Sequence, residues 1–227
     1  MPPTPRPHGP KKKANVKLPN ASSRGIPTPF LIGAAGLVAV VVVLGVVLFG
    51  RGGNGGSSTN APALLRAAGC SFQTVTALPD GDHSVTVATG TSTRWNTSPP
   101  TSGPHYEVPA IWGSYTEPLL PAQVVHNLEH GGIFIHYGSK VPRATIDQLQ
   151  VFYDSHQNGT LLAPLPSLGT TIALGVWVTD SASTPDTGEA HLAKCRRFDE
   201  KAYSAFFDAY QFKGPERFPE SALKPGS

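Results

Sequence analysis

An uncharged apolar run, Phe30 to Gly50, divides the chain into two parts of different composition. It reads FLIGAAGLVAVVVVLGVVLFG, and its length matches the roughly 20 residues that an α-helix needs to cross the hydrocarbon core of a bilayer. A cleaved signal peptide is the competing interpretation, but its apolar region spans about 7 to 15 residues and ends at a small-residue cleavage motif. We therefore predict a single transmembrane helix over residues 30–50, which anchors the chain in a lipid bilayer.

The segment before this run carries the positive charge of the chain. Residues 1–29 hold six lysine or arginine residues, eight prolines and no acidic residue, as is typical of a disordered basic tail. Because positive charge marks the cytoplasmic side of a span, we predict a single-pass cell-membrane protein with a cytoplasmic N-terminus. The tail suits the anionic lipid headgroups of the inner leaflet.

The net charge of +3 reflects this tail and not the rest of the chain. After residue 50 there are twelve basic residues against fifteen acidic ones, so the extracytoplasmic part is mildly acidic. We therefore expect no nucleic-acid partner. No particular protein partner can be inferred from the sequence.

The remaining chain is expected to form a tether and one domain. Residues 51–63, RGGNGGSSTNAPA, have the composition of a flexible linker. Residues 64–227 are long enough for one extracytoplasmic globular domain with an ordinary core. This domain holds both cysteines, Cys70 and Cys195, in a compartment where disulfides persist. We expect them to pair, and the alternative is two unpaired buried thiols.

Local patterns predict an α+β domain with a small β-sheet, two or three helices and a long proline-rich loop. Strands are expected at residues 71–78, 83–91, 133–137 and 170–180, and helices at residues 121–130, 142–157 and 199–212. The segment Arg94 to Ala122 holds six prolines, which exclude regular structure over most of its length. Residues 183–190 are expected to form an exposed turn.

The motif VVHNLEHGG, residues 124–132, gathers groups that can bind a metal or transfer a proton. On a helix, His126, Glu129 and His130 rise from one face. His105 lies in a stiff proline-flanked segment and could supply a third imidazole. We predict a metal site made by His105, His126 and His130, with Glu129 as a fourth ligand or as the group that orients the histidines.

The other histidines are ranked below this set. His136 follows on the next strand and could replace His105, and His83 is a weaker candidate. We expect His156 and His191 to be surface residues. The alternative for the helical pair is a hydrogen-bonded pair that binds no metal.

The ligand types limit the metal. Met1 is the only methionine and both cysteines are expected to be oxidised, so no soft ligand set exists for Cu(I). Imidazole and carboxylate ligands suit Zn(II), Cu(II), Ni(II) or Fe(II), and we predict zinc or copper as the cofactor.

An enzymatic alternative rests on HNLEH, which matches the His-x-x-Glu-His motif of inverted zinc proteases. In that hypothesis Glu129 is the general base of a zinc-dependent hydrolase and Glu200 is the candidate third ligand. However, Gly131 and Gly132 end the helix at once, whereas the protease helix continues past its motif. The sequence has no G-x-S-x-G motif and no phosphate-binding loop, so we predict no other catalytic residue and expect metal handling instead of catalysis.

A further alternative is a non-catalytic structural or partner-binding ectodomain, in which the histidines and loop aromatics form a hydrogen-bonded core. Four segments bear on this choice because they resemble an uncharacterised bacterial family, the domain of unknown function numbered 3105. They are SPPTSGPHY (98–106), WGSY (112–115), VHNLEHGGIFIHY (125–137) and KGPERFPESAL (213–223).

The resemblance implies a membrane-anchored domain of the bacterial cell envelope whose physiological role is unknown. The motif histidines of the family match His105, His126 and His130, and its paired cysteines match Cys70 and Cys195. The family carries no established reaction to transfer. Residues 179–192 form a stretch longer than the family pattern, so His191 receives no family role.

Overall fold

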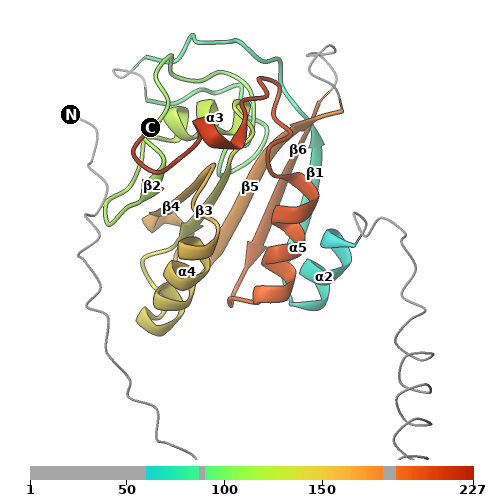
Figure 1. Ribbon diagram of the computed structural model, residues 1–227, viewed down its shortest axis with the longest axis vertical. Helices are drawn as coiled ribbons and strands as arrows, with labels where there is room; N and C mark the ends of the chain where they lie inside the picture. The colour runs from blue at the N-terminus through green and yellow to red at the C-terminus, as the bar shows by residue number, and fades with distance from the viewer. Residues whose placement is uncertain (1–59, 87–89, 181–187) are drawn as a thin grey trace, which may run out of the picture. The chain divides into compact units, whose positions relative to one another are not determined.

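The computed structural model describes residues 60–86, 90–180 and 188–227, which form an α+β fold (Figure 1). Within these residues there are six strands and four α-helices. The strands are β1 (Ser71–Thr76), β2 (Gly113–Ser114), β3 (Ile133–Tyr137), β4 (Thr160–Pro164), β5 (Ile172–Thr179) and β6 (Gly188–Cys195). The helices are α2 (Ala61–Ala67), α3 (Pro121–Glu129), α4 (Arg143–Ser155) and α5 (Glu200–Tyr210), with short 3-10 helices at Pro166–Leu168 and Glu220–Ala222.

All six strands belong to one mixed sheet in the order β1-β6-β5-β3-β4-β2. The neighbours from β1 to β3 are antiparallel, whereas β4 runs parallel to both β3 and β2. Helix α4 makes the crossover between β3 and β4, as a parallel pair requires. The apolar segment predicted as a central strand is β5, and seven of its eight residues are buried.

The sheet separates two hydrophobic clusters because side chains alternate between its faces. One face carries Ile133, Ile135, Leu174 and Val176, which pack with residues of α2, α4 and α5. The other carries Phe134, Leu161 and Trp177, which pack with α3 and the proline-rich loop. Figure 1 shows α4 and α5 across one face and α3 beside the C-terminal segment. Among the α-helices of the described chain, α3 is thus the only one that packs on its side of the sheet.

The start of α5 and both ends of α3 lie within one residue of their predicted positions. Asp199 accepts a hydrogen bond from the backbone of Ala202, and the rings of Phe198 and Tyr203 lie 5.1 Å apart across the first turn of α5. Helix α3 begins at Pro121, a residue whose missing N–H costs nothing at that position. It ends before Gly131, whose φ of 91° only glycine adopts without strain.

The prediction of a small sheet with two or three helices underestimated the number of strands and helices in the described residues. Strands β2, β4 and β6 and helix α2 were missed, and α2 begins inside the predicted linker 51–63. Strand β6, GEAHLAKC, has little intrinsic strand preference and forms because β1 and β5 pair with it on both sides. It includes residues 188–190 of the predicted turn 183–190, and residues 183–187 of that turn lie outside the described part.

The strand predicted at residues 83–91 was wrong for its described part. Residues 83–86 form no regular element, and residues 87–89 are outside the described part. Instead the backbone N–H of Val85 donates to the carbonyl of His105, and the N–H of His105 donates to the carbonyl of Asp82. This segment therefore pairs with the proline-rich loop and not with the sheet.

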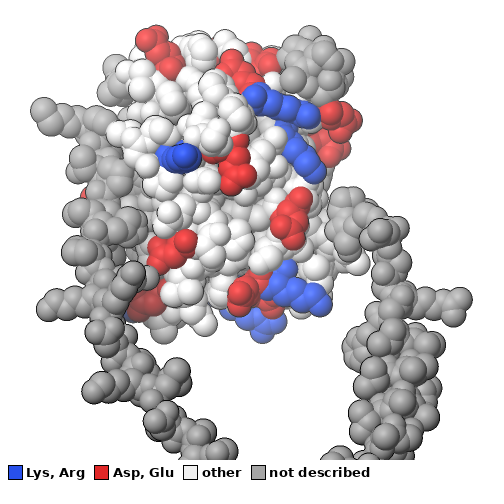
Figure 2. Space-filling view, viewed as in Figure 1, with Lys and Arg blue, Asp and Glu red and all other residues white. Residues whose placement is uncertain are grey.

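The predicted basic tail 1–29 and span 30–50, with most of the linker, lie outside the described residues. Within residues 60–86, 90–180 and 188–227, no helix has both the length and the apolar character to cross a membrane. Figure 2 shows acidic and basic side chains interspersed over the described part of the face that carries α4 and α5.

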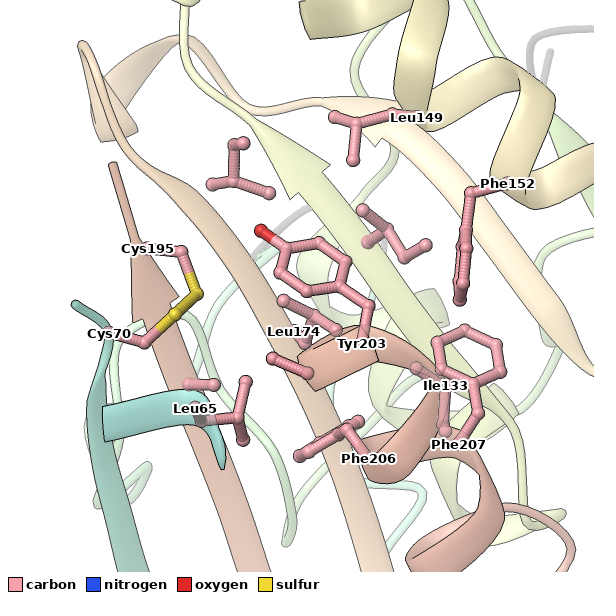
Figure 3. Close-up of a cluster of buried hydrophobic side chains, with 14 of the residues drawn as sticks. Leu65, Cys70, Ile133, Leu149, Phe152, Leu174, Cys195, Tyr203, Phe206 and Phe207 are labelled. Atoms are coloured by element: carbon pink, nitrogen blue, oxygen red, sulfur yellow. A yellow bond between two sulfur atoms is a disulfide. The ribbon is translucent and has the colours of Figure 1, made fainter. Parts of the chain in front are cut away.

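The two cysteines lie at disulfide distance, as predicted. Cys70 follows α2 and Cys195 ends β6, and their Cα atoms are 4.2 Å apart. Figure 3 shows the pair beside Leu65 and Tyr203 in the core on the α5 face. The pair joins residues that are 125 positions apart in the sequence.

Replacing both cysteines, in a Cys70→Ala/Cys195→Ala variant, should lower the free energy of unfolding by on the order of 4 kcal/mol, because the unfolded chain is no longer cross-linked. Urea unfolding of the two proteins measures the difference. A reductant should shift the midpoint of the unmodified chain and leave that of the variant unchanged. Equal midpoints without reductant would contradict the prediction.

Candidate metal centre

The candidate site lies on the α3 side of the sheet and draws on three segments. Side chains of His83, His105, His126 and Glu129 each offer one ligand atom, and these four atoms all lie within 4.8 Å of one another. Helix α3 supplies His126 and Glu129 from one face. The proline-rich loop supplies His105, and the segment after β1 supplies His83.

The contact between His105 and Glu129 is the most buried part of the site. Both side chains are fully buried, and the Nε2 atom of His105 lies 3.0 Å from an Oε2 atom of Glu129. The two atoms are nevertheless too poorly aligned for a hydrogen bond, and neither has another hydrogen-bond partner. A buried carboxylate oxygen and an imidazole nitrogen without partners are costly unless a proton or a cation lies between them.

Backbone carbonyls set the orientation of two imidazoles. The Nδ1 atom of His105 lies 2.8 Å from the carbonyl of Gly103, and that of His126 lies 2.7 Å from the carbonyl of Tyr106. A carbonyl oxygen only accepts, so each Nδ1 carries the proton and donates it. The Nε2 atom of each neutral ring then carries a lone pair, and that of His126 lies 3.1 Å from the Nε2 atom of His130. Histidines that bind metals through Nε2 are commonly held by such a bond on the other nitrogen.

The backbone around His105 is shaped for this contact. Gly103 has a φ of 93°, and a Cβ atom there would collide with Leu78. A glycine is therefore needed to bring its carbonyl under the imidazole. The Nε1 atom of Trp95 donates to the carbonyl of Pro104 at 2.8 Å, which holds the same turn from the other side.

His83 completes the four-residue group from the solvent side. Its side chain is 42% exposed, and its Nε2 atom lies 4.0 Å from the Oε2 atom of Glu129. Its ring is stacked on that of His126 at 5.1 Å and meets that of His105 edge-on at 4.7 Å. The backbone N–H of nearby Gly81 donates to Oε1 of Glu129 at 2.6 Å, which fixes the segment against the carboxylate.

His130 lies at the edge of the cluster. Its Nε2 atom is 3.1 Å from that of His126 and 3.2 Å from an Oε2 atom of Glu216. Glu129, His130 and Glu216 form a second group whose ligand atoms lie within 4.8 Å of one another. The exposed ring of Phe218 rests on His130 with the centroids 4.3 Å apart.

Asn127 clamps the proline-rich loop to α3. Its fully buried side chain donates to the carbonyl of Ala110 and accepts from the N–H of the same residue, both at 2.8 Å. These bonds make the loop an ordered wall of the site. The sequence alone did not single out this residue, although an asparagine between the two motif histidines is a polar side chain on the buried side of a short helix.

Charges in the site shift the pKa values in opposite directions. Burial acts to lower the pKa of His105, but the Glu129 carboxylate outweighs it and the pKa lies above its ordinary value. Burial acts to raise the pKa of Glu129, but His105 and the Gly81 N–H outweigh it and the pKa is lowered. Burial, followed by the repulsion of His126, lowers the pKa of His130 to about 4. Glu129 therefore stays ionised, and its negative charge attracts a proton or a metal ion to this centre.

The predicted residues are thus divided between two groups. His105, His126 and Glu129 meet in the first, and His130 lies in the second. His83, which was predicted to be a weaker candidate, joins the first group. Glu216 was not singled out, although it lies within the quoted segment KGPERFPESAL. His136, named as a substitute ligand, lies in neither group.

Two expectations about other residues were wrong. His191 is only 4% exposed, because it lies on β6 and packs against the rings of Phe72 and Tyr210. Glu200, the third ligand in the hydrolase hypothesis, begins α5, which packs on the opposite face of the sheet from α3. It cannot join the histidines of α3.

The family model described as protein of unknown function, DUF3105, matches residues 86–222. The chain belongs to the DUF3105 family. The match includes His105, His126, Glu129, His130 and Glu216, whereas His83 and Cys70 precede it. No curated protein and no solved structure matched the chain. The DUF3105 match therefore carries no reaction to this site, and the function must be argued from the geometry.

His136 gives the DUF3105 domain a separate sensitivity to acid. It is 4% exposed, neither ring nitrogen has a hydrogen-bond partner, and burial lowers its pKa to about 3. Below about pH 6.5 the unfolded chain binds a proton at this histidine and the folded chain does not, so the free energy of unfolding decreases as the pH is lowered. A His136→Leu variant should lose stability less steeply between about pH 6.5 and pH 4, by roughly 1.4 kcal/mol per pH unit.

Chemical unfolding across this pH range measures the slope. Ile135→Leu, on the adjacent residue of β3, is the matched control because it changes a buried side chain and leaves the titrating groups in place. Parallel slopes for the unmodified chain and the His136→Leu variant would contradict the assignment.

Proposed function

We propose that this DUF3105 protein is a membrane-anchored extracytoplasmic domain that binds a transition metal ion through His83, His105, His126 and Glu129. The observation that carries the proposal is the convergence of four ligand atoms within 4.8 Å around a buried carboxylate. Two of the imidazoles already donate through Nδ1, which leaves the Nε2 atom of each as the ligand atom for a metal ion. This is the preorganisation that a metal site needs.

The ligand set favours a borderline divalent ion. Three imidazoles and one carboxylate suit Zn(II), Cu(II), Ni(II) or Fe(II), and the described cysteines are paired with each other, so no thiolate competes. Ligands of one ion on bonds of about 2 Å lie no more than about 4 Å apart. The distances of 3.0 Å and 4.0 Å from Glu129 to His105 and His83 already meet this limit.

The geometry favours Glu129 as a ligand and not as the base of a hydrolase. One of its oxygens accepts from Gly81, the other faces His105, and the side chain is fully buried. A general base must keep an oxygen for a water molecule or a substrate proton, whereas both oxygens of Glu129 already face protein groups. We therefore propose metal binding in preference to hydrolysis.

The proposed location rests on the sequence and on the cysteine pair. The apolar run at residues 30–50 has the length of a membrane span, and the basic residues before it favour a cytoplasmic N-terminus. Cys70 and Cys195 lie at disulfide distance, and such pairs persist outside the cytoplasm. Together they support a domain held at the outer surface of a bacterial cell membrane.

The test is metal content and affinity of the full chain, purified in mild detergent without a histidine tag. We expect zinc or copper to bind with at least about one equivalent per chain and to raise the unfolding temperature, because a ligand that binds only the folded state stabilises it. His83→Ala should weaken binding by roughly tenfold or more while the fold is retained, since His83 is the exposed ligand.

His156→Ala is the matched control, because this histidine ends α4, where its Nδ1 atom bonds the carbonyl of Phe152 on the other face of the sheet. The metal affinity of the His156→Ala variant should equal that of the unmodified chain. Calorimetric titration and elemental analysis provide the readout. The proposal fails if the unmodified chain binds no transition metal, or if His83→Ala and His126→Ala both bind it as tightly as the control.

A further inference from the structure

A second set of ligand atoms adjoins the proposed metal centre on its outer side. Glu129, His130 and Glu216 offer ligand atoms that lie within 4.8 Å of one another, and Glu129 belongs to both sets. The Nε2 atoms of His126 and His130 lie 3.1 Å apart, so the two sets are contiguous. Glu129 is therefore placed to contact ions in both.

Backbone contacts hold Glu216 in this position. Its N–H donates to the carbonyl of Glu129 at 2.9 Å, and the N–H of Phe212 donates to the carbonyl of Gly131. Arg217 donates to the carbonyl of Thr179 at the end of β5. Figure 1 shows the resulting course of the C-terminal segment beside α3. Glu216 is thus fixed at the end of α3, unlike an ordinary surface glutamate.

A close approach of the two backbones makes this arrangement possible. A Cβ atom on Gly214 would collide with the carbonyl oxygen of Glu129 and with Gly131. Only a glycine lets the segment pass the end of α3 closely enough for Glu216 to reach His130. The position of the carboxylate therefore depends on a specific backbone contact.

The charges around Glu129, His130 and Glu216 favour the binding of a cation. The described ion-pair partners of Glu129 and Glu216 are all histidines, namely His83, His105 and His130. The Oε2 atom of Glu129 is fully buried and without a hydrogen-bond partner. Two carboxylates that converge on one neutral imidazole repel each other unless a positive ion is shared between them.

We propose that a second divalent cation binds between Glu129, His130 and Glu216, with the Glu129 carboxylate bridging it to the first. The proposal rests on the proposed function, because the first ion occupies the inner set. One imidazole and two carboxylates suit Zn(II), Mn(II), Fe(II) or Co(II). The side chain of Glu216 is 47% exposed, so this outer ion completes its coordination with water and exchanges faster than the inner one.

Titration of the full chain with Zn²⁺, and separately with Co²⁺, tests the proposal. We expect about two equivalents in two classes of affinity for the unmodified chain, with the weaker class absent in Glu216→Gln. Glutamine keeps the size of the side chain and removes its charge. Glu220→Gln is the matched control, because Glu220 lies in the same C-terminal segment and bonds Asn158 away from the site.

The outcomes separate this inference from the proposed function. About one equivalent in both the unmodified chain and Glu216→Gln overturns the second position and leaves the first. Two equivalents that persist in Glu216→Gln also overturn it, because the second ion then binds elsewhere. No bound metal in the unmodified chain overturns both. Equal unfolding midpoints of the metal-free variants and the metal-free unmodified chain show that a lost equivalent is not a folding defect.

Discussion

The buried carboxylate of Glu129 is the constraint on which the α3 side of the domain depends. A carboxylate removed from water is tolerated only when hydrogen bonds or positive charge replace its hydration. The backbone N–H of Gly81 supplies one hydrogen bond, and the imidazole of His105 supplies the nearest partner for the other oxygen. The segment after β1 and the proline-rich loop are therefore both tied to the last turn of one nine-residue helix.

The sheet provides the rigid support for this arrangement. Helix α3 packs on the face that carries Phe134 and Trp177, and the ring of Trp177 lies edge-on to His105 at 6.5 Å. Asn127, which lies between the motif histidines in the sequence, fixes the loop to the helix by two hydrogen bonds. Two of the ligands, His83 and His105, consequently come from irregular segments that hydrogen bonds hold against the helix. Precise placement of this kind is what separates a metal site from a chance gathering of histidines.

Local signals account for the parts of the fold that the sequence predicted. The N-cap at Asp199, the proline that begins α3 and the apolar run of β5 each act through neighbouring residues, and the structure has the two helices and the strand that were predicted there. Strand β6 was missed because its stability comes from β1 and β5 on either side, and a pairing across more than 100 residues leaves no local pattern.

In the candidate site, too, local sequence signals predicted some residues, and long-range contacts determine the position of others. The spacing of His126 and Glu129 on a helix was sufficient to place them together, and the glycine-proline turn singled out His105. The position of His83 depends on how the segment after β1 crosses α3, and that of Glu216 on the passage of Gly214 over the end of α3. Neither is encoded in spacing along the chain. Helical spacing thus brought His126 and Glu129 together but did not separate His130 from them, and it left out the residues that tertiary contacts bring in.

The position of Cys70 has a mechanical consequence. A force applied to the chain before α2 reaches Cys70 before it reaches Gly81 and His83. The covalent link to Cys195 passes that force into β6, inside the sheet. The residues that contact Glu129 are thereby shielded from a force that enters the domain through α2.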